Sequence, residues 1–499
     1  MPPAHLLLRS RRVVTPGGVV AAEVEVAGGV IRAVRAPAAR PSSPALLDLG
    51  DLVLLPGLVD AHVHVNAPGR TGWEGFRSAT RAAAAGGITT LVDMPLNAVP
   101  ATTTTEALRR KERAARGRLA VDVALWGGVV PGNEAELRGL WDAGVAGFKC
   151  FLAPSGVDEF PAVGEPELRR ALPILAELGA PLLVHAELPG PLEAARPGPG
   201  ADPRRYATYL ASRPPAAEVE AVRLVLSLCR EFGARVHIVH VSAAEVLPLL
   251  AEAKRAGLPV TAETCPHYLH FAAEDVPAGA TEHKCAPPIR GAANRERLWA
   301  ALADGVLDLV GSDHSPCPPA LKRRESGDFL AAWGGIASLQ LGAAVVWTGA
   351  RERGLGVERL AEWMAAAPAR LAGLSGPKRS GGPAASAGLA GPAGPPGPSG
   401  RKGVIATGAD ADLVAFDPDA EWTVDAAALH HRHKLTPYAG ARLHGVVRAT
   451  WLRGAMIYDR GALATEPAGR ILRRGEANGL HGAGRPGRRT AGRGGAAGE

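Results

Sequence analysis

Apolar, strand-like runs alternate with longer helical segments from residue 52 to residue 312. Eight runs have the composition of buried strands: residues 52–65, 88–93, 119–127, 145–149, 181–185, 235–240, 259–263 and 306–312. Helical patterns separate most of them, for instance at residues 76–85, 105–116, 165–178, 217–232 and 243–255. Eight such units over about 250 residues are typical of an α/β fold of the (β/α)8 TIM-barrel type. A doubly wound open sheet would give a similar alternation.

Both ends of the chain have a different residue pattern. Residues 6–50 contain short alternating stretches broken by glycine pairs, and residues 411–416 and 446–458 again look like strands. A chain of 499 residues also exceeds what one hydrophobic core usually organises. We therefore expect a small β-sandwich domain made from residues 1–51 and 401–474, beside a barrel at residues 52–374.

Two segments are too rich in small and polar residues to pack a core. Residues 375–400 form a Gly/Pro-rich stretch that we expect to be a flexible insertion, and residues 475–499 form a basic tail that we expect to be disordered. Residues 376–402 and this tail carry six of the seven excess positive charges. The rest of the chain is close to neutral, which argues against a nucleic-acid-binding face and favours solvated segments.

The sequence contains no apolar run of about eighteen residues, which a membrane span would need. The cluster Leu6–Leu8 is also too short for the apolar core of a secretory signal, so the predicted location is cytoplasmic. The five cysteines are an odd number and contain no C-x-x-C pair. This pattern argues against a disulfide framework and against a cysteine zinc finger.

Potential metal ligands stand at the ends of five of the eight predicted strands: His62 and His64, Lys149, His185, His240 and Asp313. His62 and His64 are two residues apart, so on a strand they share one face. Because the carboxyl ends of all barrel strands meet at one rim, we expect these six side chains to converge. A neutral Lys149 amine could react with carbon dioxide to form a carbamate that bridges two cations, although a structural lysine is the simpler alternative.

Several longer motifs carry a resemblance to a known family: PGLVDAHVHVNAPGRTGWEGF, GFKCFL, VHAE, HIVHVSAAE, ETCPHYL, KCAPPIR, SDHSPC and WGGIASLQ. The chain resembles the allantoinases, in the cyclic amidohydrolase branch of the amidohydrolase superfamily, from about residue 52 to 374 and again from 401 to 474. The resemblance implies a distorted barrel with a small β domain. It also implies a site for two divalent cations, usually zinc, held by His62, His64, carboxylated Lys149, His185, His240 and Asp313. Members are often homotetramers.

Related cyclic amidohydrolases differ near the paired histidines. Dihydroorotases carry a motif that resembles H-x-H-x-R-E-P-G, in which the arginine binds a carboxylate of the substrate. This chain has Asn66 at the position of that arginine. Hydantoinases lack the continuation from Arg70 to Gly75. Ala67 stands where the allantoinases that this chain resembles have a glutamate. A hydantoinase, dihydropyrimidinase or dihydroorotase activity is therefore the alternative.

The reaction that the resemblance implies is hydrolysis of the hydantoin ring of allantoin to allantoate, a step of purine breakdown. We expect a metal-bridging hydroxide to attack the ring amide, with Asp313 as the general acid and base. Candidates for orienting the substrate are Asn97, His267, Cys285 and Gly335. The expected partner is this small molecule, with no nucleic acid and no membrane.

Overall fold

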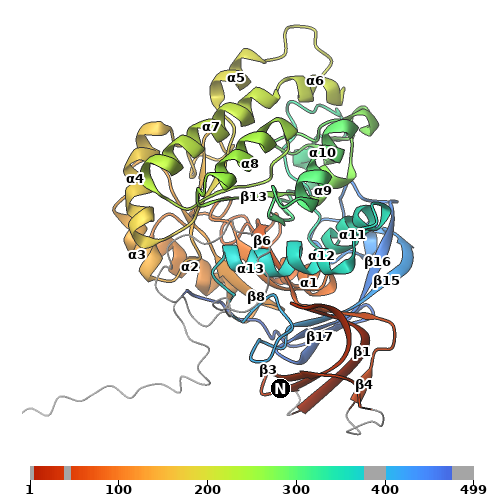
Figure 1. Ribbon diagram of the computed structural model, residues 1–499. Coiled ribbons are helices and arrows are strands. Elements are labelled where there is room, and N and C mark those ends of the chain that lie inside the picture. The colour runs from red at the N-terminus through yellow and green to blue at the C-terminus, as the bar shows by residue number, and fades with distance from the viewer. Residues whose placement is uncertain (1–4, 39–45, 376–400, 475–499) are drawn as a thin grey trace, which may run out of the picture.

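The computed structural model describes residues 5–38, 46–375 and 401–474. Parallel strands line its centre (Figure 1). They are β6 (Leu58–Val63), β7 (Ile88–Asp93), β8 (Asp122–Leu125), β9 (Gly127–Gly128), β10 (Phe148–Phe151), β11 (Leu182–His185), β12 (Val236–Ile238), β13 (Val260–Thr264) and β14 (Leu309–Val310). Strands β6–β8 form one ladder and β9–β14 another.

Two junctions join these ladders into a barrel. The chain changes partners between β8 and β9, because Trp126 donates its N–H to the carbonyl of Asp93 whereas Gly127 donates to Gly147. Strands β8 and β9 thus act as one irregular barrel strand. At the other junction, Val63 at the end of β6 forms a parallel bridge with His314, just after β14. The predicted barrel is confirmed.

Helices surround the barrel strands (Figure 1). The longer ones are α1 (Phe76–Ala85), α2 (Thr105–Ala115), α4 (Glu165–Leu178), α7 (Pro215–Phe232), α8 (Leu247–Arg255), α10 (Ala292–Ala303) and α11 (Gly342–Glu352). Helix α4 illustrates why these segments form helices. Leu168, Leu172 and Leu175 lie on one face of the helix and are buried, as an amphipathic helix requires. It ends at Gly179, whose φ of 65° suits a residue without a side chain.

The shorter helices are α3 (Glu136–Asp142), α5 (Pro189–Ala194), α6 (Tyr206–Ala211), α9 (Pro266–His270), α12 (Val357–Ala361) and α13 (Ala367–Leu371). None of the helices in these described ranges combines the length and the apolar character that crossing a membrane requires. All five cysteines are buried free thiols.

Both ends of the chain build one sheet beside the barrel (Figure 1). Its members are β1 (His5–Thr15), β2 (Gly18–Ala27), β3 (Val30–Arg35), β4 (Leu46–Asp48), β5 (Val53–Pro56), β15 (Leu413–Thr423), β16 (Arg442–Leu452), β17 (Ala455–Asp459) and β18 (Ala462–Leu463). The order is β18-β17-β16-β15-β5-β1-β2-β3, with β4 on β1. Leu8, Val24, Leu413 and Trp451 share one core, so the predicted small β domain is confirmed.

The prediction of a single strand over residues 52–65 is wrong. Strand β5 pairs with β1 and β15 in the terminal sheet, and only β6 belongs to the barrel. The chain crosses between the two sheets at Gly57, where an added Cβ would lie 2.3 Å from Thr89 Oγ1 and 2.8 Å from Asp412 Cβ. Because both strands are buried and apolar, the run shows no break in hydropathy.

The assignment of Lys402 to a solvated basic segment is also wrong. Lys402 is buried, and its Nζ donates to Asp122 Oδ2 at 2.8 Å and to Asp412 Oδ2 at 2.7 Å. Asp122 lies at the start of β8 and Asp412 just before β15, so this ion cluster ties the barrel to the terminal sheet. The predicted insertion, residues 375–400, lies outside the described residues except for Ser375, and so does the predicted tail.

Candidate metal centre and catalytic cavity

Barrel closure brings two distant motifs together. His62 lies in β6, His64 follows this strand, and Asp313 follows β14. Oδ1 of Asp313 is 3.3 Å from Nε2 of His62 and 3.4 Å from Nε2 of His64. One potential ligand atom from each of the three residues lies within 4.8 Å of the other two, so this group could hold a cation.

The other three predicted ligands lie beside this group. Nδ1 of His185 is 3.0 Å from Nε2 of His240, and the ring centroids of His62 and His240 are 5.4 Å apart. Nζ of Lys149 is 4.9 Å from the ring centroid of Phe151, which stacks on His185. The structure thus brings the six side chains close together: five lie at or just after the carboxyl ends of barrel strands, and Lys149 lies within β10.

Buried carboxylates fix which ring nitrogen of two histidines faces this centre. His62 donates from Nδ1 to Glu263, and His185 donates from Nε2 to Glu187 Oε2 at 2.8 Å. In a neutral imidazole the other nitrogen then carries a lone pair. Nε2 of His62 faces the Asp313 carboxylate, and Nδ1 of His185 faces His240. Ring nitrogens that carboxylates orient in this way are suited to bind a cation.

The two carboxylates are themselves held as anions. Burial raises the pKa of Glu187, but the Arg213 guanidinium and His185 outweigh this effect and lower that pKa to about 2. Burial also opposes ionisation of Glu263, yet His62 and His237 lower its pKa to about 2. The sequence analysis missed both residues. Their signal was their position, since Glu263 ends a predicted strand and Glu187 stands two residues after His185.

Several buried nitrogens here have no hydrogen-bond partner within the described part of the chain: Lys149 Nζ, His64 Nδ1, His240 Nδ1 and both ring nitrogens of His267. Burial lowers the pKa of Lys149 to about 8, so its amine is far easier to deprotonate than an exposed lysine. Leaving a buried polar group unpaired costs about 1–3 kcal/mol. Such groups are rare in native interiors and point to a bound ion or a modified side chain.

A cavity of about 380 Å³ opens above these residues. Its wall includes His62, His64, His185, His240 and Asp313, together with Asn97, Arg213, Lys284, Trp333 and Gly335. Asn97 and Gly335 therefore lie where a substrate could contact them. His267 and Cys285 are buried and are not among the lining residues, although both neighbours of Cys285 line the cavity. The sequence analysis did not anticipate Arg213, Lys284 or Trp333.

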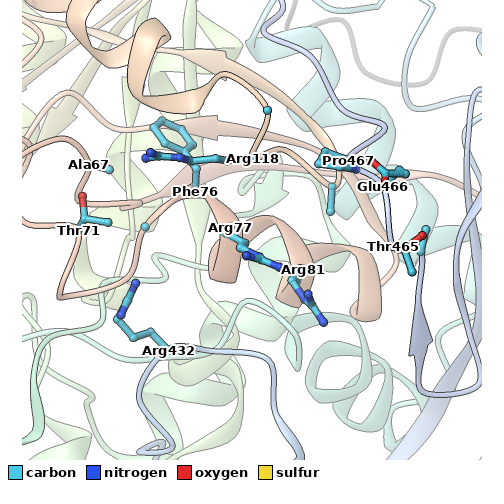
Figure 2. Close-up of a pocket in the computed structure, with 14 residues that line it drawn as sticks. Ala67, Thr71, Phe76, Arg77, Arg81, Arg118, Arg432, Thr465, Glu466 and Pro467 are labelled. Atoms are coloured by element: carbon cyan, nitrogen blue, oxygen red, sulfur yellow. The ribbon is translucent and has the colours of Figure 1, made fainter.

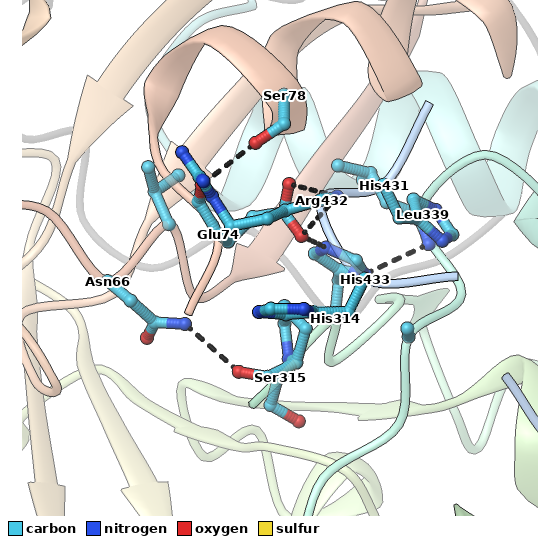
Figure 3. Close-up of polar contacts among 12 residues, drawn as sticks. Asn66, Glu74, Ser78, His314, Ser315, Leu339, His431, Arg432 and His433 are labelled. Carbon is cyan, nitrogen blue, oxygen red and sulfur yellow. Dashed lines mark hydrogen bonds and ion pairs between the residues drawn. The ribbon is translucent and has the colours of Figure 1, made fainter. Parts of the chain in front are cut away.

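A buried network behind Asp313 joins three parts of the chain (Figure 3). His314 Nε2 lies 3.4 Å from Glu74 Oε2, and its Nδ1 accepts the N–H of Ser338. The carbonyl of His314 accepts the N–H of His64 at 2.8 Å. The backbone N–H of Arg432 donates to Glu74 Oε1 at 3.2 Å. The carboxyl-terminal part of the chain thereby supports the segment that carries Asp313.

Comparison with known proteins agrees with this geometry. Residues 53–378 match the model of the amidohydrolase family. The allantoinase of Streptomyces avermitilis is 51% identical over 477 residues, which cover 95% of this chain and 100% of that protein. The allantoinase of Arabidopsis thaliana is 43% identical, covering 94% of this chain and 91% of that protein.

Solved structures are similar as well. The L-hydantoinase (dihydropyrimidinase) of Arthrobacter aurescens superposes with a TM-score of 0.85 at 31% identity, covering 95% of this chain and 100% of that one. A D-hydantoinase superposes with a TM-score of 0.81 at 26% identity, covering 94% of this chain and 99% of that one. By sequence and by structure, the chain belongs to the amidohydrolase family, in its branch of cyclic amidohydrolases.

Proposed function

We propose that this protein is an allantoinase, which hydrolyses the hydantoin ring amide of allantoin to give allantoate. The observation that carries the proposal is the cluster of imidazole nitrogens and one carboxylate from His62, His64, His185, His240 and Asp313 in the wall of a cavity of about 380 Å³. Identity of 51% to an allantoinase over almost the whole chain supports the choice of substrate.

We propose that His62, His64, Lys149, His185, His240 and Asp313 hold two divalent cations, with zinc as the expected metal. Imidazole nitrogens and carboxylate oxygens are the usual ligands of zinc. Lys149 fits as a carbamate because its Nζ is buried without a partner, and burial favours the neutral amine that carbon dioxide needs. When bound, such cations lower the pKa of water from 15.7 to about 7 and polarise an amide carbonyl.

Asp313 is suited to move the proton in this reaction. Although burial raises its pKa, His62, His64 and His267 outweigh that effect and lower it, so the carboxylate is ionised at neutral pH. It also lies on the cavity wall. Asp313 therefore accepts a proton from the attacking water and delivers it to the departing ring nitrogen.

The cavity offers neutral groups for a neutral ligand. Allantoin presents ureido and ring amides, which need both donors and acceptors. The side chain of Asn97 supplies both kinds, and Gly335 lines the same cavity. We propose these two residues as substrate contacts and give His267 and Cys285 a supporting position behind the wall.

One assay tests this proposal: release of allantoate by the purified, metal-loaded protein, with and without a chelator. Hydantoin and dihydroorotate serve as competing substrates, because the hydantoinase neighbours show the same fold. We expect kcat/KM for allantoin to exceed that for either alternative, and activity to disappear with chelator and return with zinc. A preference for hydantoin would reassign the substrate, and full activity without metal would overturn the mechanism. The homotetramer and the cytoplasmic location stay predictions.

A further inference from the structure

A second cavity, of about 550 Å³, lies between the barrel and the carboxyl-terminal part of the chain (Figure 2). Its walls come from the loop after β6, from α1, from the loop before β8, from Arg432 and from residues 464–467 after β18. It shares no lining residue with the catalytic cavity. The proposed reaction therefore gives it no role.

Four arginines contribute to this cavity. Arg77 and Arg81 project from α1, Arg118 precedes β8, and Arg432 comes from the segment between β15 and β16 (Figure 2). The side chains of the first three form no hydrogen bond or ion pair with any other residue in the described ranges. The guanidinium of Arg432 donates only to the carbonyl of Glu74. Several guanidinium forks are thus free to bind a ligand.

The local charge is strongly positive. Glu466 is the one acidic residue among those that line the cavity. Burial lowers the pKa of nearby His430, and the positive charges of Arg81 and Lys434 lower it further. Helix α1 also begins here with Gly75 as its N-cap, without a capping side chain or an acidic residue in its first turn. All these groups favour negative charge in the cavity.

We propose that this cavity binds a small anion with at least two negative charges, carried by phosphate or carboxylate groups. Arginine binds such groups through two parallel N–H···O bonds, which a chloride ion cannot form. Several guanidinium groups around one cavity repel each other, so a multivalent anion gains from each of them. The cavity volume leaves room for more than a bare phosphate ion.

The test is a titration of the metal-loaded protein with sodium sulfate by isothermal calorimetry, with sodium chloride at equal ionic strength as the blank. Sulfate is a dianion and a weak ligand for zinc. We expect saturable binding of sulfate but not of chloride. In the variant Arg77→Ala/Arg118→Ala, binding should weaken by about tenfold or more, because two charge-assisted contacts are lost.

The matched control is Arg223→Ala/Arg255→Ala, which removes two exposed arginines from α7 and α8 that also lack an ion pair within the described ranges. This control should bind sulfate as the wild type does. All four replaced side chains are exposed, so both variants should fold. Absence of saturable binding in the wild type, or equal weakening in both variants, would overturn the proposal. Unchanged binding in Arg77→Ala/Arg118→Ala would show that sulfate binds elsewhere on the protein and would also overturn the proposal.

Discussion

Two buried lysines of this protein have opposite surroundings. Nζ of Lys402 lies within hydrogen-bond distance of carboxylates on Asp122 and Asp412, and 3.2 Å from Asp410. Nζ of Lys149 has no hydrogen-bond partner in the described chain. Burial opposes the charge of both, but the three carboxylates outweigh it and raise the pKa of Lys402, whereas burial prevails and lowers that of Lys149 to about 8.

This contrast separates a structural charge from a functional one. In the cluster around Lys402, Nζ lies within 3.2 Å of three carboxylates, and the cluster joins the barrel to the terminal sheet. The group around Lys149 leaves several nitrogens without a hydrogen-bond partner within the described residues, which fits the cation site that we propose. Each of the following variants tests one side of this distinction.

The largest effect is expected for Lys149→Ala. The change removes the bridging group that we propose, so the purified protein should lose bound metal, and allantoate release should fall by about 10³-fold or more. Because the lost amine has no hydrogen-bond partner in the described chain, any decrease in the free energy of unfolding of the metal-free protein should come from the cavity left by the buried aliphatic stem. Metal analysis, the allantoate assay and chemical denaturation measure these three quantities. Full metal occupancy with normal turnover would contradict the carbamate.

The variant Asp313→Asn should fold but should have almost no catalytic turnover. The amide keeps the shape of the side chain and cannot accept the proton, so kcat should fall by about 10²–10⁴-fold. Circular dichroism and steady-state kinetics on metal-loaded protein check the two parts. A variant that retains the wild-type kcat would show that another residue moves the proton.

Lys402→Met should affect stability and leave the metal centre intact. Breaking a buried ion pair leaves uncompensated carboxylates, at a cost of about 3–5 kcal/mol in the free energy of unfolding. Metal content and KM should match the wild type below the melting temperature. As the control, Lys254→Met removes the partly exposed ion pair with Asp308 and should cost at most about 1 kcal/mol. Equal losses in the two variants would contradict a special role of the buried cluster.

The destabilisation by Lys402→Met should also depend on pH. The pKa of Lys402 is raised above 10.5, so its contribution is complete below pH 10.5 and disappears as pH rises through the raised value. Burial raises the pKa of Asp122, but Lys402 and Arg453 outweigh it and lower that pKa below 3.8. Its contribution is complete above pH 3.8 and disappears as pH falls through the lowered value. Burial raises the pKa of Asp412 above 3.8, so stability still changes until pH exceeds this raised value, and the plateau should lie between it and pH 10.5.

The smallest effect is expected for Glu74→Gln, which keeps one hydrogen-bond acceptor beside His314. If the segment that carries Asp313 is positioned less firmly, kcat should fall by about tenfold while KM stays nearly unchanged. Effects of this size are typical when residues that support metal ligands are replaced. Glu74→Ala should be worse than Glu74→Gln, so the conservative variant should rescue part of kcat. An equal kcat for both variants and the wild type would show that the Glu74 carboxylate does not act through His314.

The sequence was sufficient for features that depend on local periodicity. The helices at residues 76–85 and 165–178 have the predicted bounds, because each has a clear apolar face and a glycine directly after it. Five of the six proposed ligands stand at or just after the end of a barrel strand, where a barrel brings side chains together, whereas Lys149 ended the predicted strand but lies within β10. Neither inference required knowledge of which distant segments touch.

Features that depend on tertiary contacts could not be predicted from the sequence. The break at Gly57 separates two strands that are equally apolar, so only their different partners distinguish them. Lys402 follows a Gly/Pro-rich stretch and looked solvated, because its partner Asp122 lies 280 residues away. Glu263 and Glu187 carry charges that normally stay at the surface, and only the adjacent histidines and Arg213 explain their burial.

The contact between Val63 and His314 places the proposed ligands of the first and last barrel strands side by side. During synthesis, a ribosome therefore has to complete the eighth strand before the proposed cation site can contain all of its ligands. Truncated translation products that stop before residue 313 would lack the proposed ligand Asp313, so we expect them to bind metal more weakly than the full-length chain.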